Sequence, residues 1–216
     1  MGGRRRARKR LRRSSGPSLL ASLRPLLQVP GVRKALAVAV VYVVTLNAIV
    51  RYVGHGDAFL LSVFHLPDKS YAVMALALHS VKHVWSSHDT DTRELVAQAA
   101  SAHGVPVPLA LAIARTESGL RPHCISATGA MGLMQLMPGT AIAHAVLDPF
   151  DPAQSADGGS CYLHELWQRY HGDRERVAAA YNAGAGRVPR EGPLLGLPTE
   201  TRAYVSRVVR PHADAL

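Results

Sequence analysis

Acidic residues are absent from two long stretches of this sequence. The first 34 residues carry eleven Lys or Arg and no Asp or Glu. From residue 51 onward, fourteen basic and fifteen acidic residues nearly balance, so the formal net charge of +10 belongs to the N-terminal tail. This distribution argues against nucleic-acid binding by the main body of the chain, although a basic tail by itself suits nucleic acid or anionic lipid.

Charge of either sign is absent from the sixteen residues 35–50, which lie between Lys34 and Arg51. A helix of that length spans about 24 Å, a little less than a hydrocarbon core of about 30 Å, and Tyr52 and Val53 extend it. The basic block before it fits the positive-inside rule, so we expect a basic cytoplasmic tail over 1–34, an uncleaved anchor over 35–53 and export of the rest. A buried core helix and a cleaved signal peptide are the alternatives.

Cysteine is scarce, with only Cys124 and Cys161 in the part that we expect to be exported. An oxidising compartment permits a disulfide, which would close a loop worth about 4 kcal/mol in the chain-entropy model. The spacing does not decide between this disulfide and two free thiols.

Runs of alternating apolar and polar residues are also missing, which argues against a sheet. Helix signals are frequent instead: Asp91 is suited to an N-cap with Glu94 three residues later, and Pro108 and Gly119 bracket an apolar helix. Three more segments, 151–172, 173–184 and 199–211, have similar start and stop residues. The sequence predicts a mostly α bundle of short helices over residues 90–216, after a stem over 54–89.

One carboxylate stands apart within this bundle. Glu117 ends the apolar helix, and the thirty residues 118–147 that follow contain no Asp or Glu. Apolar neighbours and the C-terminal end of a helix both disfavour the charged form of a carboxylate, so we expect a raised pKa and a general acid. The alternative is an ordinary solvated Glu at a helix end.

Two glycines follow in the segment GAMG. Gly129 and Gly132 would let the backbone approach a ligand closely, because no Cβ intervenes, and Gln135 can both donate and accept hydrogen bonds. Such groups suit a neutral ligand rich in hydroxyls and amides, such as an amino sugar. Ordinary turn glycines are the alternative.

Four segments together resemble the ordered signatures of the Slt-type lytic transglycosylases: ES at 117–118, GAMGLMQLMPGTA at 129–141, AAYNAGAGRV at 179–188 and LPTETRAYV at 197–205. The resemblance covers roughly residues 90–212. It implies a lysozyme-like, α-rich domain that cleaves the MurNAc–GlcNAc bond of peptidoglycan, with Glu117 as the single acid and base.

The resemblance also implies roles for other side chains. Ser126 would assist near the MurNAc substituents, Met134 and Gln135 would line the glycan groove, and Tyr204 would close the site. Tyr181 and Asn182 would position the sugar and the catalytic carboxyl. The family's usual Phe-Asn-Pro after ESG reads Leu120, Arg121 and Pro122 here, and Cys124 in the same loop is outside the general pattern.

The missing second carboxylate bears on the mechanism. Most glycosidases use two carboxylates, yet after Glu117 the next candidates are Asp148 and Asp151. A lone Glu suffices if it protonates the leaving oxygen and then takes a proton from the C6 hydroxyl of the same sugar, which yields a 1,6-anhydro end. A hydrolytic muramidase with a distant carboxylate folded into the cleft is one alternative, and a catalytically weak peptidoglycan-binding scaffold is another.

The remaining expectations concern cofactors and partners. His79 and His83 are four residues apart, but no acid or cysteine accompanies them, so we expect a polar face near the membrane and no metal or cofactor. The expected partners are peptidoglycan strands and the bacterial inner membrane, without nucleic acid, with cell-wall or secretion machinery as a further candidate. The catalytic domain is expected in the periplasm or its extracytoplasmic equivalent, on a single-pass anchor.

Overall fold

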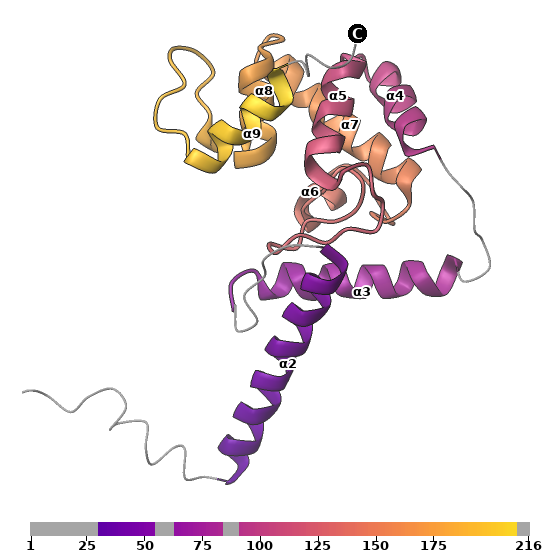
Figure 1. Cartoon of the computed structure of the whole chain (residues 1–216), viewed down its shortest axis with the longest axis vertical. Coiled ribbons are helices and arrows are strands. Elements are labelled where there is room, and N and C mark those ends of the chain that lie inside the picture. The colour runs from indigo at the N-terminus through magenta and orange to yellow at the C-terminus, as the bar shows by residue number, and fades with distance from the viewer. Residues whose placement is uncertain (1–29, 55–62, 84–90, 211–216) are drawn as a thin grey trace, which may run out of the picture. The chain divides into compact units, whose positions relative to one another are not determined.

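The computed structural model describes residues 30–54, 63–83 and 91–210 (Figure 1). Within these ranges the regular elements are helices, and the extended pairings are two isolated bridges, Ile125–Met131 and Met131–Leu136. The prediction of a mostly α fold is confirmed. Most of the basic tail, much of the stem and the last six residues lie outside the described residues.

The chain divides into two compact units, residues 1–42 and 43–216. Helix α2, Pro30–Gly54, begins in the first unit and ends in the second. Its stretch Gly31–Val53 is 23 residues long with a mean hydropathy of 2.0, and little of it is buried within the protein. It has the length and composition to cross a membrane, and it is longer than the uncharged run because the helix continues through Arg33, Lys34 and Arg51.

Helix α5, Val107–Ser118, is the central helix of the second unit. It contacts α4, Thr92–Ala102, and α9, Thr199–Val209, while α7, Pro152–Arg169, packs on α4 and on α8, Arg174–Ala183 (Figure 1). Ala110, Ile113 and Ala114 of α5 are fully buried, because this side of the helix meets neighbouring helices.

Short-range signals set the ends of these helices. The Asp91 carboxylate accepts from the backbone N–H groups of Arg93 and Glu94, as its N-cap position predicts. Asp151 and Asp173 cap α7 and α8 in the same way. Gly119 ends α5 in the left-handed conformation at φ 64°, which glycine adopts without strain.

The Gly-rich connection between α5 and α6, Pro138–Ala143, is packed against the protein itself. A Cβ on Gly132 would lie 1.8 Å from the Pro149 carbonyl oxygen, and one on Gly129 would lie 2.7 Å from the Asp68 backbone. The expectation that these glycines let the loop backbone approach a ligand is therefore wrong. Their missing side chains admit two other segments of the same chain instead.

Helix α3, Leu66–His83, is the segment against Gly129. It also packs on α6, and its His79 is buried, with Nδ1 3.0 Å from the Asp148 carboxylate and Nε2 3.1 Å from His123 Nε2. Both ring nitrogens of His79 therefore face the helical domain, and the expectation of a polar face near the membrane stays a prediction. His83 is described only as part of the helix.

Candidate active site

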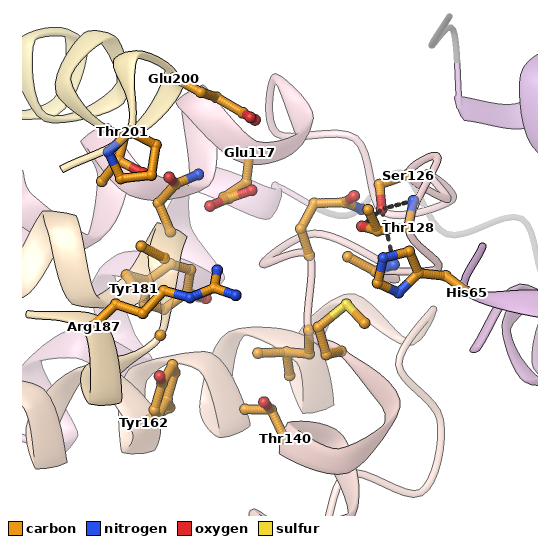
Figure 2. A pocket seen from close by; sticks show the side chains of 18 residues that line it. His65, Glu117, Ser126, Thr128, Thr140, Tyr162, Tyr181, Arg187, Glu200 and Thr201 are labelled. Carbon is orange, nitrogen blue, oxygen red and sulfur yellow. Dashed lines mark hydrogen bonds between the residues drawn. The ribbon is translucent and has the colours of Figure 1, made fainter. Parts of the chain in front are cut away.

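An open pocket of about 630 Å³ lies where the end of α5 meets the Gly-rich connection, α8 and the start of α9. Its lining is rich in hydroxyl and amide groups. Figure 2 shows Ser126, Thr128 and His65 on one side and Tyr181 and Arg187 on the other, with Glu117 between the two sides. Side chains that are 136 residues apart in sequence, from His65 to Thr201, therefore border one cavity.

Glu117 is the acid of this pocket. It is partly buried near the C-terminal end of α5, and burial raises its pKa from the ordinary 4.5 to about 7. A hydrogen bond from Tyr204 and the charge of Arg207 act in the opposite direction and lower that pKa. A substantial fraction of Glu117 is thus protonated at neutral pH, as a general acid requires.

Tyr204 holds the Glu117 carboxyl in place. It lies on α9, and its hydroxyl donates to Glu117 Oε1 at 2.7 Å. Burial, followed by the neighbouring Glu117 charge, raises the pKa of Tyr204 well above its ordinary value, so the hydroxyl keeps its proton. A donor that never titrates in the working range stabilises the carboxylate that forms once Glu117 has given up its proton.

Ser118 and Tyr181 attach the connecting loop to the helices that flank the acid. The Ser118 hydroxyl lies 2.7 Å from the Leu133 carbonyl oxygen, and the Tyr181 hydroxyl donates to the Met134 carbonyl at 2.8 Å. The C-terminal parts of α5 and α8 are therefore both hydrogen-bonded to the same loop. Tyr181 and its neighbour Asn182 both line the pocket.

Gln135 and Ser126 brace the opposite wall. Gln135 Nε2 donates to the carbonyl oxygens of Cys124 and Gly132, at 3.1 and 2.8 Å, from a backbone with φ 50°. The Ser126 hydroxyl accepts from the N–H groups of Thr128 and Ala130. Both side chains still line the pocket, so this wall is fixed before any ligand arrives.

Met134 does not line the pocket. Its side chain is fully buried against Gly159 of α7, where a Cβ would lie 2.6 Å from the Met134 side chain. The expectation that Met134 borders the glycan groove is therefore wrong for the side chain. Only its carbonyl takes part, as the acceptor for Tyr181.

The two cysteines are not bonded to each other. Cys124 is buried in the loop, with Sγ 3.9 Å from the Ser118 carbonyl oxygen, and Cys161 is a free, partly exposed thiol on α7. Of the two alternatives left by the spacing, the structure contains the free thiols.

Neither distant carboxylate considered from the sequence lines the pocket. Asp148 is buried beside His79 and accepts from the Phe150 N–H, and Asp151 caps α7. The second carboxylate that does line it is Glu200, an exposed residue in the first turn of α9. Figure 2 shows it above Glu117 at the edge of the pocket.

Among the pocket residues that were not identified from the sequence, four have titratable side chains: His65, Tyr162, Arg187 and Glu200. Arg187 and Glu200 stand inside the third and fourth signatures, which was a usable signal. His65 immediately precedes α3, and Tyr162 lies on α7. Nothing in the pattern around these two distinguishes them from packing or solvent-exposed residues.

The comparisons with known proteins agree with the site. The family described as the transglycosylase SLT domain matches residues 94–193. The soluble lytic murein transglycosylase of Escherichia coli K12 is 36% identical over 128 residues, covering 49% of this chain and 20% of that protein. The transglycosylase of phage PRD1 is 32% identical over 117 residues, covering 54% and 41%.

A membrane-bound lytic murein transglycosylase C, from Edwardsiella ictaluri, is 36% identical over 115 residues and covers 45% of this chain and 32% of that protein. The X-ray structure of lytic transglycosylase Slt from Pseudomonas aeruginosa superposes with a TM-score of 0.49 at 25% identity, over 67% of this chain and 29% of that one. The chain thus spans between a fifth and about two fifths of these curated relatives. Residues 94–193 are the part of the chain that is similar to the transglycosylase SLT domain.

Proposed function

We propose that this protein is a membrane-anchored peptidoglycan lytic transglycosylase that cleaves the β-1,4 bond between MurNAc and GlcNAc and leaves a 1,6-anhydro-MurNAc end. The observation that carries the proposal is Glu117, a carboxyl with a pKa of about 7, held by Tyr204 beside a pocket rich in hydroxyl and amide groups. The match to the transglycosylase SLT domain and the names of the relatives support it.

Glu117 performs both proton transfers in this mechanism. As an acid it protonates the glycosidic oxygen that leaves with GlcNAc, while the N-acetyl group of MurNAc stabilises the cation developing at C1. As a carboxylate, stabilised by Tyr204, it then takes the proton of the MurNAc C6 hydroxyl as that oxygen bonds to C1. The proton returns to Glu117 and no water is consumed.

A hydrolytic muramidase is the second candidate, and Glu200 is the observation that favours it. A second carboxylate at the pocket edge is what activation of a water molecule would require. We favour the transglycosylase because Glu200 is exposed, and no hydrogen bond holds it toward Glu117 in the described part of the chain.

Muropeptide mass spectrometry separates these candidates. Purified peptidoglycan is digested with the full chain in detergent, as wild type, Glu117→Gln and Glu200→Gln. We expect anhydro-MurNAc products from wild type and from Glu200→Gln within about tenfold of each other, and a loss of at least about a thousandfold in Glu117→Gln.

Other outcomes would overturn the proposal. Reducing-end MurNAc that disappears in Glu200→Gln would establish hydrolysis. Binding of peptidoglycan by folded wild type without any cleavage would favour the scaffold reading.

The location we propose is the inner membrane, with α2 as a single-pass anchor and the SLT domain on the extracytoplasmic side. The length and apolar composition of Gly31–Val53 and the basic residues before it support this topology. The names of the membrane-bound relatives support attachment to a membrane, without indicating which membrane or which topology. Labelling of Leu195→Cys in intact cells, in a background with Cys124→Ala and Cys161→Ala, tests it, since only an extracytoplasmic thiol is labelled by a reagent that does not cross the inner membrane.

A further inference from the structure

Helix α3 has one face with polar side chains, which packs against the protein, and an opposite face with apolar side chains, which is exposed. Residues 69, 72, 76 and 79 recur at spacings of three, four and three, and face the protein. This face contains Lys69, 1% exposed, and His79, 8% exposed. Charged and polar side chains normally lie on the solvent side of a surface helix, not on the packed side.

The other face carries the large apolar side chains. Tyr71, Met74, Leu78 and Val81 repeat the same spacing two residues later, which is about 200° around a helix. Their exposed fractions run from 41% to 75%, and no charged residue interrupts the series. In water this face would cost free energy, because four neighbouring apolar groups remain hydrated.

The polar groups of the inward face have partners. The Lys69 ammonium donates to Asn47 Oδ1 at 2.8 Å, and His79 lies 3.0 Å from the Asp148 carboxylate. The inward polarity of α3 therefore belongs to a specific docked arrangement. Asp68 and the backbone of Gly129 meet so closely that the docking leaves no room for a side chain on the loop.

The Lys69–Asn47 contact also places α3 relative to the end of α2. Asn47 belongs to the stretch with the length and composition of a membrane span, six residues or about 9 Å before its end at Val53. Val50 of α2 and Ala72 of α3 are members of the same buried cluster. The first turns of α3 are thus packed beside the C-terminal end of the apolar helix, at the depth where a bilayer meets water.

We propose that α3 is an interfacial membrane helix, whose face formed by Tyr71, Met74, Leu78 and Val81 lies on the lipid surface while its opposite face carries the SLT domain. The occupant of this apolar face is the bilayer because α3 packs beside the end of the apolar helix, so the exposed face of α3 lies at the level where that helix would leave the hydrocarbon. The inference rests on the anchoring in the proposed function. An interfacial α3 holds the glycan pocket at a fixed short distance from the membrane, because His65, next to α3, lines that pocket.

Site-directed spin labelling of the full chain in proteoliposomes tests this inference. Single cysteines are introduced at Met74 or Leu78 in a background with Cys124→Ala and Cys161→Ala. Collision rates with oxygen, which partitions into lipid, and with a water-soluble nickel chelate report the surroundings of each label. Retained peptidoglycan cleavage shows that each labelled protein is folded, since neither Met74 nor Leu78 lines the pocket.

Two matched positions calibrate the measurement. Leu195→Cys replaces a leucine that is 78% exposed and lies two residues after the SLT match, and Val41→Cys replaces a residue 64% exposed in the middle of α2. We expect labels at Met74 and Leu78 to collide with oxygen at least about threefold more, relative to the chelate, than the label at Leu195. The label at Val41 should be the most protected from the chelate.

The outcomes distinguish a failure of the interfacial helix α3 from a failure of the membrane anchor α2. A lipid-exposed label at Val41 with chelate-accessible labels at Met74 and Leu78 would overturn the interfacial helix and leave the anchor intact. Chelate access at Val41 would overturn the anchor itself. Protection at Leu78 with dipolar broadening between labels would overturn the lipid assignment in favour of a second copy, and protection from both reagents would assign the face to another part of the chain.

Discussion

At the scale of single residues, the contact between Glu117 and Tyr204 decides the chemistry of the pocket. Burial raises the pKa of the acid, and the tyrosine hydroxyl moderates that rise by stabilising the carboxylate. The balance leaves Glu117 able to donate a proton and then to accept one near neutral pH, which a single-residue mechanism requires.

Tyr204→Phe tests this balance. Because the Tyr204 hydrogen bond lowers the pKa of Glu117, its loss lets that pKa rise above about 7. Activity that needs protonated Glu117 falls as pH rises through the pKa, so we expect the alkaline limb of kcat/KM to move to higher pH. The maximum should fall about tenfold to a hundredfold, the equivalent of one hydrogen bond to a charged group.

Arg207→Gln is the matched control for that experiment. The Arg207 charge also lowers the pKa of Glu117, without a hydrogen bond from the arginine to the carboxyl among the described contacts. The limb should move in the same direction while the maximum changes little. A limb that stays in place or moves to lower pH in Tyr204→Phe would contradict the assigned role.

At the scale of elements, the conformation of the loop between α5 and α6 is fixed by the segments that pack against it. Ser118 and Tyr181 bond its carbonyls, and its glycines meet the backbones of Asp68 and Pro149. The pocket wall is therefore rigid because of close backbone packing. The same packing makes the loop sensitive to the smallest substitution.

Gly132→Ala should destabilise the protein by about 3 kcal/mol or more, because its Cβ would lie 1.8 Å from the Pro149 oxygen and its φ is 76°. Gly139→Ala is the control: a Cβ there meets nothing within 4 Å, in the first turns of α6. We expect it to leave the free energy of unfolding unchanged or to raise it by up to about 1 kcal/mol. Urea unfolding of both variants measures the difference, and similar losses in the two would contradict the packing explanation.

At the scale of the whole molecule, the position of α3 bears on where the functional domain begins. The sequence predicts a domain starting at residue 90, and that boundary stays a prediction. Residues 43–216 form one compact unit, in which α3 contributes His79, Ala72 and the backbone against Gly129.

We expect the free energy of unfolding of a fragment with residues 63–216 to exceed that of a fragment with residues 91–216 by about 2 kcal/mol or more. The shorter fragment lacks the hydrogen bond between His79 and Asp148 and the apolar contacts of α3. Urea denaturation of both fragments measures this. Leu78→Ser in the longer fragment is the control, since Leu78 is 56% exposed and lies outside the buried cluster, and it should change the free energy of unfolding by less than about 0.5 kcal/mol. Equal stability of the two fragments would support a boundary at residue 90.

Several features of this protein were determined by the sequence alone. The caps at Asp91, Asp151 and Asp173 and the stop at Gly119 were readable because they depend on residues within one helical turn. The apolar helix was readable because its composition is continuous. Glu117 was identifiable because an isolated acid after an apolar helix is a local pattern, reinforced by four ordered signatures.

The tertiary structure alone decided the surroundings of those features. Met134 is buried rather than groove-lining, Glu200 and His65 join the pocket, and the two glycines admit other backbones rather than a ligand. Each of these depends on which apolar faces pack together across tens of residues, and a local pattern does not encode that choice. The inside-out polarity of α3 is of the same kind: its residues were visible in the sequence, but only docking showed which of its two faces the protein had left uncovered.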